Sequence, residues 1–145
     1  MNRLPDVLLI EDNEDDIAVA RWALAKHNLS EHVAVVHDGQ EALDVLSSRP
    51  AGQTRLVLLD LKMPRMDGRE VLRRLRADER TRTMPVVVIS TSQRHADIEE
   101  SYRLGANSYV CKRYGPSAAG DHLIEVLRYW LDVNRLPPPP GGGTP

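Results

Sequence analysis

LVLLDLKMP, residues 56–64, is the stretch that decides the fold: four aliphatic residues, then Asp60, with a proline four positions further on. A short aliphatic run of this kind is typical of a parallel strand that is buried on both faces. Open sheets of such strands bind their ligands in the crevice beyond the carboxyl ends of the strands. Asp60 therefore stands where a functional residue is expected.

Three other strand-like runs end in polar residues in the same way. The runs and the residues that follow them are VLLI with Glu11 and Asp12, VVVI with Ser90, and SYVC with Lys112. Carboxyl ends of parallel strands meet at one edge of a sheet, so these side chains and Asp60 are expected to gather there. Three carboxylates, a hydroxyl and an ammonium suit the binding of a divalent metal ion and a phosphoryl group.

Strand-like and helix-like segments alternate along the chain. The expected strands are residues 7–10, 33–36, 56–59, 86–89 and 108–111, and the expected helices are residues 14–28, 40–48, a segment around 71–75, 95–104 and 117–133. This succession predicts an α/β fold of the flavodoxin-like (βα)5 type. Its five-stranded parallel sheet would be doubly wound, with strand order 2-1-3-4-5 and helices on both faces.

The length of 145 residues suits one domain around a single core, which we place at residues 1–136. Residues 137–145 read PPPPGGGTP and are expected to form a disordered tail, because prolines favour polyproline II and glycines are flexible. A ligand for a proline-recognition domain is the alternative for this tail.

Charge and composition argue against several classes of function. The net charge of −2 gives no support for binding nucleic acid or a membrane surface, and the apolar runs are too short to span a bilayer. No signal-peptide pattern opens the chain, and the single cysteine, Cys111, excludes an internal disulfide. We therefore expect a cytoplasmic protein in which Cys111 is a small buried residue of a strand.

One local excess of positive charge extends from Arg65 to Arg82, with seven arginines against four acids. We interpret this segment as the solvated face of a helix. A docking surface for a partner is the alternative.

The acids at the sheet edge predict a specific chemistry. Glu11, Asp12 and Asp60 would repel one another without a cation, and Mg²⁺ prefers such hard oxygen ligands. A carboxylate is also a nucleophile for phosphoryl transfer, which needs little beyond positioning and charge neutralisation. Lys112 would neutralise one phosphoryl oxygen, and Ser90 would donate a hydrogen bond to another. Taken singly, these residues read equally well as a helix-capping acid pair, a surface lysine and a strand-end cap.

From residue 4 to about residue 134, the chain resembles the receiver domain of two-component response regulators. The matching motifs are ED at residues 11–12, DLKMP at 60–64 with DG at 67–68, Ser90 and Lys112. Their spacing matches too, since Ser90 lies 30 residues after Asp60 and Lys112 lies 22 residues after Ser90. As a set, these motifs are highly specific.

The resemblance implies roles for the residues at the sheet edge. Asp60 would accept a phosphoryl group from a sensor histidine kinase in a Mg²⁺-dependent reaction, with Lys112 and a hydroxyl completing the catalytic set. Asp12 and Asp60 would bind Mg²⁺ directly and Glu11 through water, and the backbone carbonyl of Lys62 would add a further oxygen.

The resemblance also implies a switch pair, Ser90 and Tyr109. In receivers the hydroxyl moves toward the phosphate, and the aromatic ring three residues before the lysine rotates inward. For Tyr109 the alternative is an amphipathic residue on a partly exposed strand.

Three segments resemble, more narrowly, stand-alone receivers that serve bacterial phytochrome-type kinases. They are EDNEDD at residues 11–16, STS at 90–92 and YWLDVNRLP at 129–137. This resemblance implies a signalling protein without an output domain that catalyses its own phosphorylation and slow dephosphorylation but is not a metabolic enzyme. A homodimer through the fourth helix, fifth strand and fifth helix is plausible, although the apolar residues of the fifth helix could equally all be core.

One departure from the family pattern concerns the residue after the lysine. Receivers usually have a proline there with a cis peptide bond, whereas this chain has Arg113. A cis bond before a residue other than proline costs about 2.5–4 kcal/mol, so we predict a trans Lys112–Arg113 bond and a reshaped loop.

Two other functions remain open on the sequence. One is a receiver-like binding module that acts without phosphorylation, which Arg113 weakly favours and the complete acid set disfavours. The other is a Mg²⁺-dependent aspartyl phosphohydrolase. Such enzymes usually carry an acid two residues after the nucleophile, where this chain has Lys62.

Overall fold

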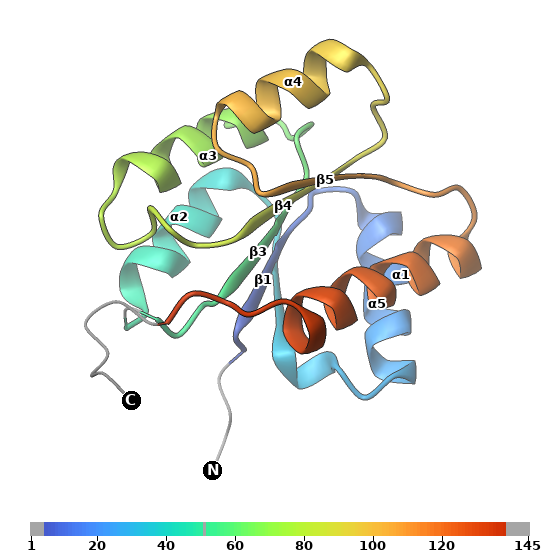
Figure 1. The fold of residues 1–145 in the computed structure, drawn as a ribbon. Helices are drawn as coiled ribbons and strands as arrows, with labels where there is room; N and C mark the ends of the chain where they lie inside the picture. Colours follow the sequence, from blue (N-terminus) through green and yellow to red (C-terminus); the bar gives the residue numbers. More distant parts are fainter. Residues whose placement is uncertain (1–4, 51, 139–145) are drawn as a thin grey trace.

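A computed structural model describes residues 5–50 and 52–138, which fold around one five-stranded parallel sheet (Figure 1). The strands are β1 Val7–Ile10, β2 Val33–Val36, β3 Leu56–Leu59, β4 Val86–Ser90 and β5 Ser108–Cys111. All neighbours pair in parallel, in the order β2-β1-β3-β4-β5. The predicted fold class and strand order are confirmed.

Helices cover both faces of the sheet. They are α1 Glu14–Lys26, α2 Gly39–Ser48, α3 Gly68–Ala77, α4 His95–Arg103 and α5 Pro116–Arg128, with a short 3₁₀ turn at Ser30–His32 and a π-helical turn at Tyr129–Val133. Helices α1 and α5 lie on one side of the sheet, and α2, α3 and α4 lie on the other (Figure 1). No helix within the described residues is both long and apolar enough to cross a membrane.

The core follows the two-residue period of the strands. One face of the sheet turns Leu8, Ile10, Val57, Leu59, Val86 and Val88 toward Val71, Leu72 and Leu75 of α3. The other face turns Val7, Leu9, Leu56, Leu58 and Val87 toward Ala20 and Leu24 of α1 and Ile124 and Leu127 of α5. Strands β1 and β3 are buried along their whole length, as the aliphatic run in residues 56–59 predicts.

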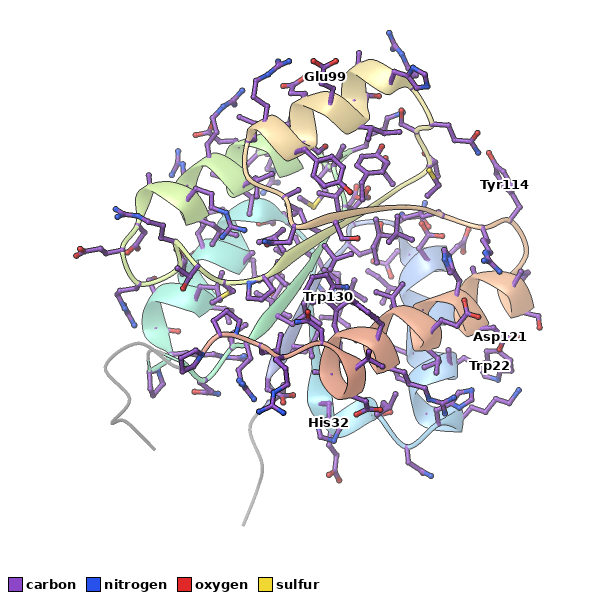
Figure 2. The ribbon with its side chains drawn as sticks, viewed as in Figure 1. Trp22, His32, Glu99, Tyr114, Asp121 and Trp130 are labelled. Carbon is purple, nitrogen blue, oxygen red and sulfur yellow. The ribbon has the colours of Figure 1, made fainter. Side chains whose placement is uncertain are left out.

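Two helix ends differ from the expected ones by more than one residue. Helix α1 ends at Lys26, before the predicted end, because Asn28 takes a left-handed conformation with φ 57°. The last helix is α-helical only to Arg128 and continues as a π-helical turn to Val133. Trp130 of that turn is half-buried and points toward the sheet (Figure 2).

The basic segment is not a solvated face throughout. Arg76 of α3 turns back onto the start of the neighbouring strands instead of into solvent. Its guanidinium donates hydrogen bonds of 2.8–3.3 Å to the carbonyl oxygens of Thr81, Arg82, Met84 and Gly105 and to Oδ1 of Asn107. Burial lowers the pKa of Arg76 from its ordinary value. The interpretation as a solvated face is wrong for Arg76 and holds for Arg73 and Arg74, which are exposed.

The predicted domain boundary at residue 136 lies inside the described part of the chain. Pro137 is half-buried, and Pro137 and Pro138 line a small cavity of about 30 Å³ beside Thr54 and Arg55. The rest of the predicted tail, residues 139–145, lies outside the described residues, so its disorder stays a prediction.

Replacing Arg76 by Ala is expected to lower the free energy of unfolding by about 2–3 kcal/mol, because four carbonyl groups in the loops before β4 and β5 lose a charged donor. Urea unfolding followed by circular dichroism measures the loss. Arg73→Ala, on the same helix, removes an exposed arginine and is expected to change the free energy by no more than about 0.5 kcal/mol. Equal losses in the two variants would contradict the structural role of Arg76.

Candidate functional site

The pairing of β1 with β3 brings two carboxylates together at the end of the sheet. Ile10 is opposite Leu59, so the next residues, Glu11 and Asp60, follow from adjacent strands. The amide of Asp60 donates to the carbonyl of Ile10 at 3.1 Å, which extends the strand pairing to the phosphoacceptor candidate itself. Glu11 is 4% exposed and Asp60 is 7% exposed.

Asp12 completes a group of three acids. One carboxylate oxygen from each of Glu11, Asp12 and Asp60 lies within 4.8 Å of the others. Hard oxygen donors at this separation, carrying more negative charge than one neighbouring lysine balances, fit a divalent cation. The exposed side chain of Lys62 plays no part in this cluster, although its amide donates to Asp60 Oδ1 at 3.3 Å. The predicted ligand role of the Lys62 carbonyl stays a prediction.

Lys112 reaches the same cluster from the end of β5. Its Nζ atom donates to Glu11 Oε2 at 2.7 Å and to Asp16 Oδ2 at 2.8 Å, and it lies 3.7 Å from Asp60 Oδ2. The sequence placed Lys112 correctly but did not connect it with Asp16. The available signal was that Asp16 closes the EDNEDD segment at residues 11–16.

The electrostatic environment shifts two pKa values in this cluster. Burial, followed by the negative charge of Glu11, raises the pKa of Asp60 from 3.8 to about 7, although Lys112 opposes the shift. Burial disfavours the charged form of Lys112, but hydrogen bonds from Lys112 to Asp16 and Glu11 outweigh it and raise the pKa of the lysine. Without a cation, Asp60 is therefore a weakly acidic group beside a permanently charged ammonium.

A glycine allows the loop after Asp60 to fold closely over the strand end. A Cβ atom on Gly68 would lie 2.5 Å from the carbonyl oxygen of Asp60 and 2.7 Å from the Cα atom of Leu61. The amide of Gly68 donates to the carbonyl of Leu61 at 2.9 Å. Asp67 then caps α3 by accepting hydrogen bonds from the amides of Arg69 and Glu70. The DG motif thus fixes the start of α3 directly against the backbone of Asp60.

Ser90 is fully buried at the end of β4 and begins a chain of hydrogen bonds toward α4. Ser90 Oγ accepts from the amide of Ser92 at 3.1 Å, and Ser92 Oγ donates to Asp97 Oδ2 at 2.5 Å. The carbonyl of Ser92 accepts from the Tyr109 hydroxyl at 2.8 Å. Arg69 of α3 donates to the other oxygen of Asp97 at 2.9 Å. The two predicted switch residues therefore both contact Ser92, whereas the sequence gave no role to Asp97 or Arg69, which are 28 residues apart.

The peptide bond after Lys112 has the configuration predicted for it. The described residues contain no cis peptide bond, so the trans Lys112–Arg113 bond is confirmed. Arg113 is exposed, and it lines a cavity of about 90 Å³ together with Glu11, Asp60 and Lys112. Tyr114 is 83% exposed and projects from this loop away from the rest of the molecule (Figure 2). Cys111 is half-buried, less than expected, and its thiol lies 3.7 Å from the carbonyl of Ser92.

Comparison with known proteins finds a matching domain family and clear homologues. The model of the response regulator receiver domain family matches residues 7–124. A probable methanogenesis regulatory protein, FilR2 of Methanothrix harundinacea, is 35% identical over 92% of this chain and 88% of its own length.

Among solved structures, the phosphorylated cyanobacterial phytochrome response regulator RcpA is 36% identical, with a TM-score of 0.82, and the match covers 92% of this chain and 99% of that one. The Mn²⁺-bound form of Rcp1, a response regulator of Synechocystis, is 29% identical over the same shares, with a TM-score of 0.79. The bacteriophytochrome response regulator AtBRR is 38% identical, with a TM-score of 0.66, over 84% of this chain and 91% of that one.

Asp60→Asn is expected to stabilise the metal-free protein by about 2 kcal/mol at about pH 8. Between the ordinary pKa of 3.8 and the folded value of about 7, the folded state binds more protons than the unfolded state. The wild type therefore loses stability as the pH rises through this window, and the variant, which has no carboxylate to ionise, does not. Urea unfolding with a chelator present, from about pH 5 to 8, measures the difference.

The exposed Asp15→Asn replacement is the control for this measurement. It is expected to change stability by less than about 0.5 kcal/mol at each pH. A stabilisation by Asp60→Asn that did not grow with pH would contradict the raised pKa of Asp60.

Proposed function

The chain belongs to the response regulator receiver domain family, and on this basis we propose that it is a phosphorylation switch in which Asp60 accepts a phosphoryl group from a sensor histidine kinase. It is a signalling protein that resembles phytochrome response regulators. The observation that carries the proposal is the placement of a buried Asp60 beside two further carboxylates and the Lys112 ammonium.

In the transfer, a carboxylate oxygen of Asp60 attacks the phosphorus atom of the phosphohistidine, and the P–N bond breaks with its electron pair going to the imidazole. Lys112 neutralises charge on a phosphoryl oxygen, since its ammonium lies 3.7 Å from Asp60 Oδ2. Both side chains line the same cavity, so a group attached to Asp60 has open space on the side of Lys112. Positioning and charge neutralisation are the main contributions that such a reaction requires.

Mg²⁺ is the cation that we assign to the acid cluster. Asp12 and Asp60 would bind it directly, Glu11 would bind it through water, and the Lys62 carbonyl would supply another oxygen. When bound, it would keep the carboxylates ionised and neutralise the phosphoryl oxygens. The oxygen donor set, and the divalent ion named for Rcp1, support this assignment.

Phosphorylation would act on α4 through the hydrogen bonds of Ser92. If Ser90 turns its hydroxyl toward a phosphoryl oxygen, the contact between Ser90 and the Ser92 amide changes, and Ser92 also bonds to Tyr109 and Asp97. These contacts connect the phosphorylation site to α4 and β5. Phosphorylation would then bias two arrangements of this region and change the protein contacts that it makes.

The names of the relatives and the exposed residues suggest the partners. RcpA and AtBRR are phytochrome response regulators, which supports a phytochrome-type histidine kinase as the phosphodonor. The sheet edge β5, with exposed Tyr102 on α4 and exposed Tyr129 and Val133 after α5, supports a homodimer through the α4–β5–α5 surface.

One phosphoryl group is expected to appear on the protein after incubation with acetyl phosphate and Mg²⁺, and intact-mass spectrometry detects it. The adduct should be absent without Mg²⁺ and absent from Asp60→Asn, because the reaction needs both the carboxylate and the cation. The exposed Asp15→Asn replacement is the control and should accept the group as the wild type does. No adduct on the wild type would overturn the proposal and favour a module that acts without phosphorylation.

A further inference from the structure

The ammonium of Lys112 is held by a residue outside the set that its proposed catalytic role requires. Among the described side chains, Glu11 and Asp16 accept hydrogen bonds from its Nζ atom, at 2.7 and 2.8 Å. Asp60 Oδ2 lies at 3.7 Å, beyond hydrogen-bonding distance. The lysine side chain is only 17% exposed, so these contacts define most of the polar surroundings of the ammonium.

The two carboxylates fix the lysine from different elements. Glu11 follows β1, whereas Asp16 belongs to the first turn of α1, and its backbone amide donates to the capping Asn13 at 2.9 Å. The cap holds the first turn in place and with it the Cα atom of Asp16. Asp16 remains 46% exposed, so its carboxylate is hydrated and is a ready acceptor for a charged donor.

An ammonium has three N–H donors, and two of them are occupied here. The third N–H donor remains available for an acceptor near Asp60, whose Oδ2 atom lies 3.7 Å from Nζ. A phosphoryl group on Asp60 places oxygens beyond the carboxylate, in the cavity that Lys112 also lines. A flexible lysine that is already fixed by two acceptors loses less conformational freedom when it binds a phosphoryl oxygen.

We propose that Asp16 is a positioning residue for phosphoryl transfer, which holds the Lys112 ammonium with one N–H donor free for an oxygen of the phosphoryl group on Asp60. This inference rests on the proposed phosphorylation of Asp60. It also separates Asp16 from its neighbours Glu14 and Asp15. All three acids stand in the first turn of α1, but only Asp16 bonds to Lys112 within the described part of the chain.

The test compares the rate of Asp60 phosphorylation by acetyl phosphate, at saturating Mg²⁺, in the wild type, Asp16→Ala and Asp15→Ala. Asp16→Ala is expected to slow the reaction roughly three- to tenfold, as the loss of one charge-assisted hydrogen bond in the transition state would. Asp15→Ala removes the same charge from the same helix turn and is expected to change the rate by less than about twofold. The Mg²⁺ concentration for half-maximal rate should stay unchanged in both variants.

A second comparison separates positioning from a general structural effect. In a Lys112→Ala background, Asp16→Ala should have no further effect on the rate, and Asp16→Glu in the native background should restore part of it. If Lys112→Ala reacts too slowly for a rate to be measured, the affinity for beryllofluoride, an analogue of the phosphoryl group, is measured in the same variants instead.

Three results would overturn the inference while the wild type is still phosphorylated. They are equal effects of Asp16→Ala and Asp15→Ala, an Asp16 effect that persists without Lys112, and faster phosphorylation of Asp16→Ala. The last result would mean that Asp16 holds the Lys112 ammonium away from the phosphoryl group instead of positioning it. Failure of the wild type to be phosphorylated would instead refute the proposed function itself.

Discussion

The candidate site depends on one constraint, the close approach of three carboxylates at the carboxyl ends of β1 and β3. The register of β1 against β3 places Glu11 beside Asp60, and Asp12 follows directly. Burial, followed by the negative charge of Glu11, disfavours the ionised form of Asp60 and raises its pKa. The fold maintains this arrangement because buried aliphatic strands fix the register, and because the Lys112 ammonium offsets part of the charge.

The backbone around Asp60 is closely packed, and hydrogen bonds that the sequence pattern does not indicate connect α3 and the β4–α4 loop to their neighbours. Gly68 allows α3 to start against the carbonyl of Asp60, and Arg76 ties the other end of α3 to the loops before β4 and β5. Both contacts hold α3 by its ends. The β4–α4 loop is held differently, by the hydrogen bonds of Ser92 to Tyr109 and Asp97, and Arg69 joins this network from α3. Ser92 therefore links Ser90 by hydrogen bonds to Asp97 of α4 and to Tyr109 of β5.

Much of the architecture could be predicted from local patterns. The strand-like runs identified each strand within the described residues, and their alternation with helical segments predicted a doubly wound parallel sheet. The strand order followed from the flavodoxin-like type of that sheet and is confirmed. The same runs ended in Glu11, Asp12, Asp60, Ser90 and Lys112, which the fold brings to one edge as expected. Helix ends were predicted less well, since the left-handed Asn28 and the π-helical turn after Arg128 follow from no clear sequence signal.

The sequence by itself determined the fold class, the carboxylate cluster and the trans Lys112–Arg113 bond, because aliphatic runs, the residues that follow them, their alternation with helical segments and the absence of proline after Lys112 can all be read along the chain. Only the tertiary structure decided that Asp16 accepts a hydrogen bond from Lys112 and that Arg76 turns away from solvent. Asp16 and Lys112 are 96 residues apart, and Arg76 and Gly105 are 29 apart. Their contacts depend on how the helices pack against the sheet, and the pattern of charges along the chain does not show which distant residues this packing brings together.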